Sequence, residues 1–581
     1  MRERWITDWA PSARWPHYTR ANSGEVAPTP ASPLSATYTW DNAICQGWRD
    51  GYVRTGNYSR DEFDDAHPEA VGFFGGYMYI NLSNVRMQGV RNPAVTVDQL
   101  DLAFFGDHPD VPPYEAHPED ERPDLLEKIV AHLEWQMTSR TWPEIDRERE
   151  ETTALRAARP DLTALTDTEL LSRAREIQAL ITKLFESHTL TSSGSGIAPA
   201  IFFAVGQAIG DPTVPMKLVA GIGEVDSTEP SLRMWELSRA IRSSTALTAA
   251  FDAGVAGLEA RLEADGEPDA QAFLAEWRRF IADFGARAAN EYEISADTWE
   301  TRPALALATL ERVRLQTDDE SPALRLARRV AEREQVTAEV RSRLQDLGNE
   351  ELAGQFEAAL VASSQLSFRE RTKTNLIRAV HEARMVFREL GRRHAAAGDL
   401  ADPAHIFQLL DSELDGFVAE PGKYRDELAG RAAEWAELFD LEPPFIIRDG
   451  KVPPLGEWPR RGQADVAVLA AGATLQGVPG CPGKATGRAR VILEVGDPGD
   501  LEPGDILVAP MTDPGWASLF MAAAGVVVEV GGQISHAIIV SRELGLPCVV
   551  SATGACRAIP NGALLEVDGD TGTVTVLEMP A

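Results

Sequence analysis

The sequence predicts a multidomain protein: a mainly α-helical domain with an irregular or β-rich N-terminal part, followed by a small C-terminal α/β domain. Three observations predict it. The first 120 residues are rich in Pro, Gly and aromatic side chains. Residues 123–441 carry apolar stripes at spacings of three and four, and from about Ala473 short β-branched runs alternate with Gly and Pro. We therefore expect four segments, namely 1–120, 121–440, a linker at 441–472, and 473–581.

The amino-acid composition argues against several classes of protein function. The 581 residues hold 56 Lys and Arg against 89 Asp and Glu, a net charge of −33 that disfavours nucleic acid and anionic membranes. The start, MRERWITDW, lacks the apolar run of a signal peptide. The longest apolar stretch, 197–209, is shorter than the roughly 20 residues that cross a bilayer. Since the four cysteines form no C-x-x-C pair, we expect a cytoplasmic protein without disulfides.

The elements up to residue 441 follow from local patterns. The prolines of GEVAPTPASPLS (Gly24–Ser35) predict extended chain. The segment Val71–Met87 predicts strand, turn and strand, with Gly75 and Gly76 in the turn. Two later stripes each predict one buried helix face. Their residues are Leu247, Phe251, Val255, Leu258 and Leu262 in one, and Phe273, Trp277, Phe280 and Phe284 in the other.

Beyond the helices, the connector LEPPFIIRDGKVPPLGEWPRRGQ (Leu441–Gln463) contains two Pro-Pro pairs, which predict a semi-rigid spacer. The following runs predict the strands of the α/β domain, in the segments ARVILEV, GDILVAP, GVVVEV, LPCVV, ALLEVDG and GTVTVLE. One clear helix, HAIIVSREL, lies among them.

The most informative residues surround this helix. Val526–Val530 predicts a buried strand, and Gly531 and Gly532 predict a turn where backbone can approach a ligand. Ser535 is a natural N-cap, so the helix is expected to begin at His536 and to end near Gly545. Unpaired N–H groups and the helix dipole favour a phosphoryl dianion there, and a neutral imidazole is a nucleophile. Position alone also fits an ordinary capping or surface histidine.

The same stretch resembles the mobile phosphohistidine domain of the phosphoenolpyruvate-utilising enzymes. The matching residues are Gly531, Gly532, Ser535, His536, Ala537, Ile539, Arg542, Glu543, Gly545 and Pro547. Ile534, Ile538 and Ser541 depart from the usual pattern. The resemblance implies that His536 carries the phosphoryl group, with Gly531, Gly532 and Ser535 in the phosphoryl loop. It also implies that Gly477–Ile492 forms the first hairpin of the domain.

The helical region resembles the acceptor domain of the rifampin-type antibiotic phosphotransferases. FGARAANEYEISADTW matches its G-H-R-x-x-x-E segment through Arg287 and Glu291, with Ala286 where that family has His. FRERTKTNLIRAVHEAR matches its R-E-x-x-K helix. The resemblance implies catalytic roles for Arg287 and Lys373. It implies substrate-binding roles for Glu291, Arg369 and Glu370. Such cations would neutralise developing phosphoryl charge, although charged residues on helices also serve as plain solvated faces.

Length and order also resemble the larger subunit of the two-chain phenylphosphate and alkylphenol phosphate synthases. No G-x-x-x-x-G-K-[ST] loop occurs in the sequence, and no ATP-grasp domain is expected in it. The resemblance implies a separate ATP-grasp subunit that binds ATP with Mg²⁺ and gives the β-phosphoryl group to His536, leaving AMP and phosphate. A phenol or other small hydroxyl compound then accepts the group. No metal ligands are expected on this chain.

The acceptor end is harder to assign. His188, expected near a helix end before a Gly-Ser turn, is a candidate general base, although a surface histidine would also fit. His381 and His394 lie on amphipathic patterns and are expected to be structural. Ile197–Ile209 and Gly72–Tyr79 could line an apolar pocket, and both fit core segments as well. Two other functions stay open: a rifamycin-type phosphotransferase fragment, and a non-catalytic phosphoryl-relay or regulatory protein.

Overall fold

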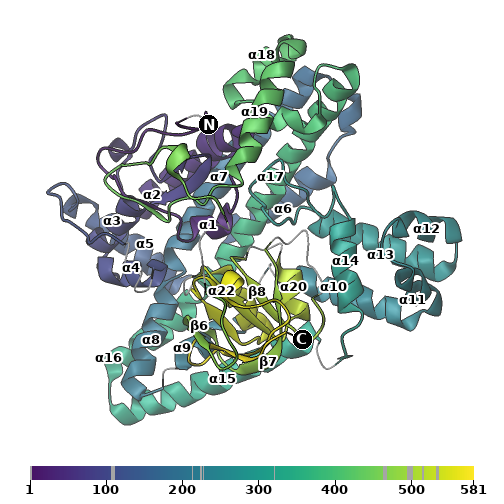
Figure 1. Ribbon diagram of the computed structural model, residues 1–581. Helices are drawn as coiled ribbons and strands as arrows, with labels where there is room; N and C mark the ends of the chain where they lie inside the picture. The colour runs from purple at the N-terminus through teal and green to yellow at the C-terminus, as the bar shows by residue number, and fades with distance from the viewer. Residues whose placement is uncertain are drawn as a thin grey trace. The chain divides into compact units, whose positions relative to one another are not determined.

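The computed structural model describes residues 3–105, 111–211, 213–222, 226, 228–318, 321–461, 467–493, 501–512, 516–531 and 535–580. The chain forms two compact units, each built from three separate stretches of sequence. The first comprises Met1–Ile197, Asn290–Ser295 and Ser364–Asp465. The second comprises Ala198–Ala289, Ala296–Ser363 and Val466–Ala581. Figure 1 colours the chain by residue number, along which these stretches alternate, and the predicted boundaries at 120, 440 and 472 stay predictions.

Two long helices form the centre of the first unit. The helix α7 (Asp167–Gly194) packs along α17 (Ser364–Ala397), and α2 (Cys45–Thr55) packs on α7. A capping box begins α7, because Thr166 Oγ1 accepts from the Glu169 backbone while the Glu169 carboxylate accepts from the Thr166 backbone. The other helices of this unit are α1 (Ser23–Val26), α3 (Leu82–Arg91), α4 (Val97–Phe105), α5 (Leu126–Thr138), α6 (Pro143–Ala157), α18 (Leu414–Ala419) and α19 (Arg425–Leu438).

A small antiparallel sheet completes the first unit. Its order is β2-β3-β1-β4, with β1 (Tyr18–Thr19), β2 (Val71–Phe74), β3 (Tyr77–Asn81) and β4 (Ile446–Ile447). The predicted strand–turn–strand is confirmed, and Gly75 and Gly76 adopt the positive φ angles of 59° and 77° that the turn requires. After Asn81, however, the chain continues as helix α3 and not as strand. A π-helix at Ser35–Ile44 and helix α2 also make the N-terminal part more helical than the sequence indicates.

The Pro-rich connector carries its own structure. Ile446 and Ile447 pair with β1, which makes this segment the fourth strand of the N-terminal sheet. Leu441, Leu455 and Trp458 are buried in the same core, each at most 5% exposed. The connector was predicted as a spacer over 441–472, whereas its residues up to Arg461 are integrated into the first unit.

The helices of the second unit carry the predicted apolar faces. Along α13 (Pro268–Phe284), the predicted stripe is confirmed, since Phe273, Trp277, Phe280 and Phe284 are all buried. The stripe from Leu247 to Leu262 is buried on α11 and α12, with Val255 packed beside it. The helices here are α8 (Ile197–Ile209), α9 (Val214–Val219), α10 (Glu229–Ser243), α11 (Thr245–Asp252), α12 (Leu258–Asp265), α14 (Ala304–Val313), α15 (Pro322–Leu347), α16 (Glu350–Ala362), α20 (Ala517–Ala522), α21 (His536–Leu544) and α22 (Ala555–Ala558).

The second unit also contains an eight-stranded mixed sheet, drawn in yellow-green in Figure 1. Its order is β5-β12-β11-β7-β8-β9-β10-β6, with β7 to β10 parallel. The strands are β5 (Thr474–Gln476), β6 (Val478–Cys481), β7 (Lys484–Val491), β8 (Ile506–Ala509), β9 (Gly525–Val528), β10 (Cys548–Val550), β11 (Leu564–Asp568) and β12 (Thr573–Glu578). Each of the six predicted runs contains a strand, although the strand in ARVILEV ends at Val491 and the last two residues of that run lie outside the described residues. The predicted first hairpin is wrong, because β6 pairs with β10 while β7 pairs with β8 and β11.

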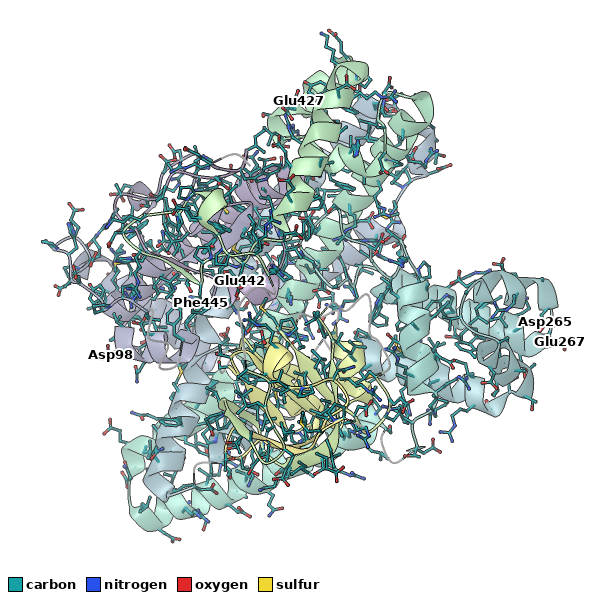
Figure 2. The ribbon with its side chains drawn as sticks, in the orientation of Figure 1. Asp98, Asp265, Glu267, Glu427, Glu442 and Phe445 are labelled. Atoms are coloured by element: carbon teal, nitrogen blue, oxygen red, sulfur yellow. The ribbon has the colours of Figure 1, made fainter. Side chains whose placement is uncertain are left out.

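Surface and apolar features agree with the composition. Exposed acidic side chains include Asp98, Asp265, Glu267, Glu427 and Glu442 (Figure 2). The continuous stretch Asp167–Ile209 is long and apolar enough to cross a membrane by length and composition alone. Its α7 portion packs against α2, α17 and other elements of the first unit, as a core helix of a globular unit does. A cytoplasmic location therefore stays a prediction.

Candidate functional site

The loop after strand β9 positions His536. The chain leaves β9 and reaches Ser535, whose extended backbone (φ −68°, ψ 155°) is that of an N-cap. Helix α21 then begins at His536 and ends at Gly545, which takes the left-handed conformation at φ 69°. Both helix boundaries are as predicted. The Ser535 hydroxyl, however, makes no cap hydrogen bond, so only its backbone acts as the cap.

The imidazole of His536 lies where two parallel strands end. Its Nδ1 atom is 3.3 Å from Oγ1 of Thr512, which follows β8, while His536 itself follows β9. The ring of Phe520 contacts the imidazole edge-on at a centroid distance of 5.9 Å. The carboxyl edge of parallel strands and the first turn of a helix are both places where proteins bind anions. His536 is thus oriented in a setting suited to a phosphoryl group.

The space around the glycine before this helix is tight. A Cβ atom on Gly531 would lie 3.0 Å from Ser535 Oγ and 3.2 Å from Val550 Cβ. The Gly531 carbonyl accepts a 2.7 Å hydrogen bond from the Ser551 hydroxyl, which fixes the start of the loop. Gly532, the other predicted glycine of this loop, lies outside the described residues.

The candidate base His188 lies inside helix α7 and not in a loop, because α7 continues to Gly194. Its Nδ1 is 3.0 Å from Thr372 Oγ1 on α17, and its Nε2 is 3.4 Å from Ser192 Oγ. Burial lowers the pKa of His188 to about 3, with a further contribution from the positive charges of Arg369 and Lys373. The imidazole is therefore neutral at pH 7, and its lone pair is available.

Helix α17 brings the predicted cations to this histidine. Lys373 Nζ is 3.9 Å from Glu291 Oε2, and the Glu291 side chain is only 1% exposed. The Nη1 atom of Arg369 is buried and has no hydrogen-bond partner among the described residues. Burial raises the pKa of Tyr292 above its usual range; Glu291 raises it further, and Arg369 opposes the increase. Five predicted residues of the first unit therefore cluster: His188, Glu291, Arg369, Glu370 and Lys373.

A buried arginine holds the Glu291 segment in this cluster. Arg384 on α17 donates through Nη2 to the carbonyl oxygens of Glu291 and Glu293, at 2.9 and 3.0 Å. The remaining predicted residue, Arg287, belongs to the second unit and is 7% exposed. Its carbonyl accepts from the Trp299 backbone at 3.0 Å. The catalytic role of Arg287 therefore stays a prediction.

Several polar residues near His188 were not predicted. Thr372 contacts the imidazole directly, and it lies within the same motif as Arg369 and Lys373, three residues after Arg369 and so on the same helix face. One turn further along α7, Ser193 Oγ accepts from Gln136 and lies 3.3 Å from His132. Burial lowers the pKa of His132 to about 4. The run of Ser and Thr in HTLTSSGSG was the available signal for this polar face.

We expect acid to destabilise the fold through His188. Its folded-state pKa is about 3, whereas unfolded histidine titrates near 6.5, so the unfolded state binds more protons between these values. The contribution of neutral His188 to the free energy of unfolding is complete above about pH 6.5 and is lost as the pH falls toward about 3. His188→Gln should reduce the pH slope of the unfolding free energy, measured by urea denaturation, by up to about one proton. His132→Gln should act in the same direction, and an unchanged slope for His188→Gln would contradict the expectation.

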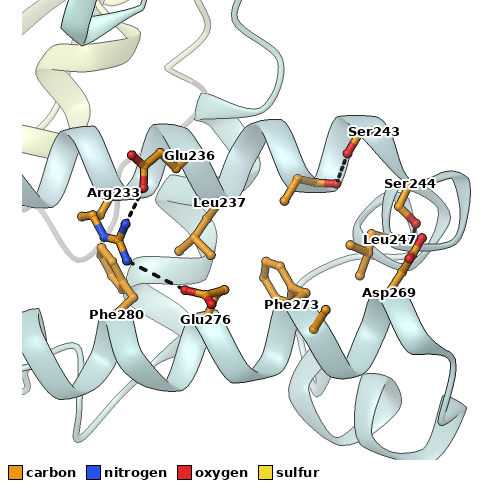
Figure 3. Close-up of a pocket in the computed structure, with 12 residues that line it drawn as sticks. Arg233, Glu236, Leu237, Ser243, Ser244, Leu247, Asp269, Phe273, Glu276 and Phe280 are labelled. Atoms are coloured by element: carbon orange, nitrogen blue, oxygen red, sulfur yellow. Dashed lines mark hydrogen bonds and ion pairs between the residues drawn. The ribbon is translucent and has the colours of Figure 1, made fainter.

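The two apolar segments that could line a pocket differ in how far they are buried. Gly72–Tyr79 is fully buried core in β2 and β3, whereas Phe203 on α8 is 56% exposed. A different groove of about 460 Å³ lies on the second unit between α10, α11 and α13 (Figure 3). Its floor is apolar and its rim is charged, and none of the predicted site residues lines it. The lining residues include Arg233, Glu236, Leu237, Leu247, Asp269, Phe273, Glu276 and Phe280.

Among the described residues, no three His, Cys, Asp or Glu side chains are grouped as a metal site would require.

Comparisons with known proteins bear on both regions. Residues 501–572 match the mobile domain of the PEP-utilising enzymes, and residues 188–370 match the fourth domain of rifampicin phosphotransferase. The chain is 43% identical over 222 residues to an uncharacterized protein of Mycobacterium tuberculosis, covering 38% of this chain and 24% of that protein. It is 29% identical over 368 residues to the prodigiosin synthesizing transferase PigC of Serratia marcescens, covering 62% of this chain and 40% of PigC.

A third relative is the rifampicin phosphotransferase of Streptomyces sviceus, 30% identical over 302 residues, which cover 51% of this chain and 34% of that enzyme. The chain thus spans between a quarter and two fifths of these curated relatives. His536 lies in the first matched region, and His188, Glu291 and Arg369 lie in the second. Two parts of the chain are therefore similar to known domains, one to the mobile domain of the PEP-utilising enzymes and the other to the fourth domain of rifampicin phosphotransferase.

Proposed function

We propose that this chain is part of a phosphotransferase in which His536 carries a phosphoryl group to the hydroxyl of a small organic acceptor. The observation that carries the proposal is the placement of His536 at the first residue of α21, within the matched mobile domain. A neutral imidazole nitrogen there can form the N–P bond as the donor P–O bond breaks. The helix N-terminus offers N–H groups to the phosphoryl oxygens.

The acceptor is, in this proposal, a phenol of the phenol or p-cresol type. Its oxygen attacks phosphorus, the N–P bond to His536 breaks, and the phenolic proton passes to a base. A phenol titrates near pH 10, so nearby cations favour its anion. Arg369 and Lys373 are placed to supply this charge beside His188. Transfer requires that the phosphoryl group of His536 be delivered to these cations.

We further propose that the phosphoryl donor is ATP with Mg²⁺, bound by an ATP-grasp domain on a separate subunit. The resemblance to two-chain aryl phosphate synthases supports this assignment. The donor step would leave AMP and inorganic phosphate, since the β-phosphoryl group passes to His536 and the γ-phosphoryl group passes to water. We also propose a cytoplasmic location, which agrees with the free cysteines of the described residues, three of them buried.

A reconstitution tests the proposal. Residues 1–581 with ATP, Mg²⁺ and phenol are expected to yield no phenyl phosphate. Addition of the ATP-grasp subunit of an aryl phosphate synthase should yield phenyl phosphate, AMP and phosphate in equal amounts. ADP as the nucleotide product would contradict a β-phosphoryl route. Phosphorylated His536 that is stable toward every acceptor would favour a relay protein instead.

A second candidate is a rifamycin-type acceptor, favoured by the match of residues 188–370 to the rifampicin phosphotransferase domain. The same reconstitution, with rifampicin in place of phenol, separates the two. Consumption of rifampicin with no phenyl phosphate in the parallel reaction would replace the phenol by an antibiotic hydroxyl.

A further inference from the structure

The inference concerns the proton arrangement around His188 and rests on the proposed function. The imidazole lies between two hydroxyl groups, with Nδ1 3.0 Å from Thr372 Oγ1 and Nε2 3.4 Å from Ser192 Oγ. Phe185 packs edge-on against the ring at 5.4 Å, which fixes the ring plane. Thr372 is fully buried, so its hydroxyl must satisfy its hydrogen bonds within the protein.

Counting hydroxyl protons assigns a direction to the Thr372 contact. A hydroxyl has one proton, and Thr372 Oγ1 lies 3.0 Å from the Arg369 carbonyl oxygen, which can only accept. Thr191, the next hydroxyl in the cluster, likewise lies 3.0 Å from the His188 carbonyl oxygen. With both protons directed at carbonyl oxygens, Thr372 Oγ1 is left as an acceptor for the ring nitrogen that faces it.

The Arg369 carbonyl is a further acceptor beside this contact. It lies 3.0 Å from Thr372 Oγ1, and its hydrogen bonding favours the protonated imidazole against the larger effect of burial, which lowers the pKa of His188. On the opposite side, the 3.4 Å contact to Ser192 is long for a hydrogen bond, so Nε2 is only weakly engaged.

We propose that Thr372 is a positioning residue that holds His188 in the Nδ1–H tautomer and leaves the Nε2 lone pair as the general base. In the reaction, the acceptor O–H proton passes to Nε2 as its oxygen attacks phosphorus and the N–P bond of phospho-His536 breaks. The resulting imidazolium keeps its Nδ1–H bond to Thr372. An arriving phosphoryl dianion would offset the charges of Arg369 and Lys373, two causes of the low basicity of the free imidazole.

The tautomer can be measured without any activity. The full chain, labelled with ¹⁵N at histidine, is examined by NMR near pH 7, and the His188 signals are assigned by their loss in His188→Gln. We expect Nδ1 to be protonated and Nε2 to be unprotonated. In Thr372→Val, which keeps the side-chain shape but removes the acceptor, this preference should be lost. Thr372→Ser should retain it. Protonated Nε2 in the unmodified chain would overturn the proposal.

Kinetics then separate positioning from general damage. With His536 phosphorylated by the ATP-grasp subunit, Thr372→Val should slow transfer to phenol by about 10²-fold, the scale of a lost general base. Its phosphorylation of His536 should be unchanged, and Thr372→Ser should restore transfer. Unchanged transfer in a Thr372→Val chain that has lost the tautomer preference would overturn the role of Thr372. If no acceptor is ever phosphorylated, the proposed function fails, while the NMR result still decides the tautomer.

Discussion

His536→Ala is expected to abolish both the phosphorylated form of the chain and the transfer of phosphate to the acceptor. The imidazole of His536 supplies the nitrogen atom of the N–P bond, and the first turn of α21 contains no other nucleophilic side chain. Loss of a covalent nucleophile reduces turnover by roughly 10⁴-fold or more. Mass spectrometry of the reconstituted mixture should find an acid-labile, base-stable adduct at His536 in the unmodified chain and none in the variant.

The matched control is His117→Ala, which removes an exposed histidine of the first unit. It should retain both the adduct and full transfer. Residual turnover by His536→Ala above the background of the mixture would show that the group passes directly from nucleotide to acceptor. An adduct on another histidine would reassign the carrier while leaving the acceptor cluster untouched.

The second large effect is expected at Arg369. Its Nη1 atom is buried and, among the described residues, has no hydrogen-bond partner, so its charge is available to an incoming phosphoryl group. Arg369→Met keeps the length of the side chain and removes the charge. Loss of one oriented donor to developing negative charge reduces transfer by about 10²- to 10³-fold. Phosphorylation of His536 should be unaffected, because that step uses the other unit.

Arg371→Met serves as the control on the same helix. Arg371 donates to Asp146 at 2.6 Å, and the Asp146 side chain is 53% exposed. An exposed ion pair of this kind contributes little, so transfer should change by less than about twofold. Equal losses in both variants would indicate general damage to α17, and full transfer by Arg369→Met would remove Arg369 from the acceptor cluster.

The C-terminal domain was predictable because its signals are local. Each β-branched run is bounded by Gly or Pro, and the helix at His536 has an N-cap before it and Gly545 after it. Among the N-terminal helices, α2 ends at Gly56 but has no side-chain N-cap. In α2, Gly47 and Gly51 weaken intrinsic helix formation, yet they allow α7 to approach. A Cβ on Gly47 would lie 2.2 Å from the Thr182 carbonyl oxygen, so this helix is set by tertiary packing that a local pattern does not reveal.

In the candidate site, too, a local pattern predicts some of the residues, and long-range packing brings the others to them. Arg369 and Lys373 share a helix face because they are four residues apart. The approach of Glu291 to Lys373 depends on Arg384, which binds the carbonyl oxygens of a segment far away in sequence. The partner of His188 is also distant, since Thr372 follows it by 184 residues. Sequence resemblance suggested Glu291, Arg369, Glu370 and Lys373, whereas His188 was chosen for its expected position before a Gly-Ser turn; long-range packing explains why they meet.

The eight-stranded sheet ends in an unusual way. Its two outermost strands, β5 and β6, are successive pieces of one segment, Thr474–Cys481, separated only by Gly477. The same short segment therefore covers the side of β12 at one end and the side of β10 at the other. What stays open for strand addition is two pieces of three and four residues, one containing Pro479, and short or Pro-bearing edges are poor templates for aggregation. Loss of this one segment would uncover two strands at once, β12 with six residues and β10 with three.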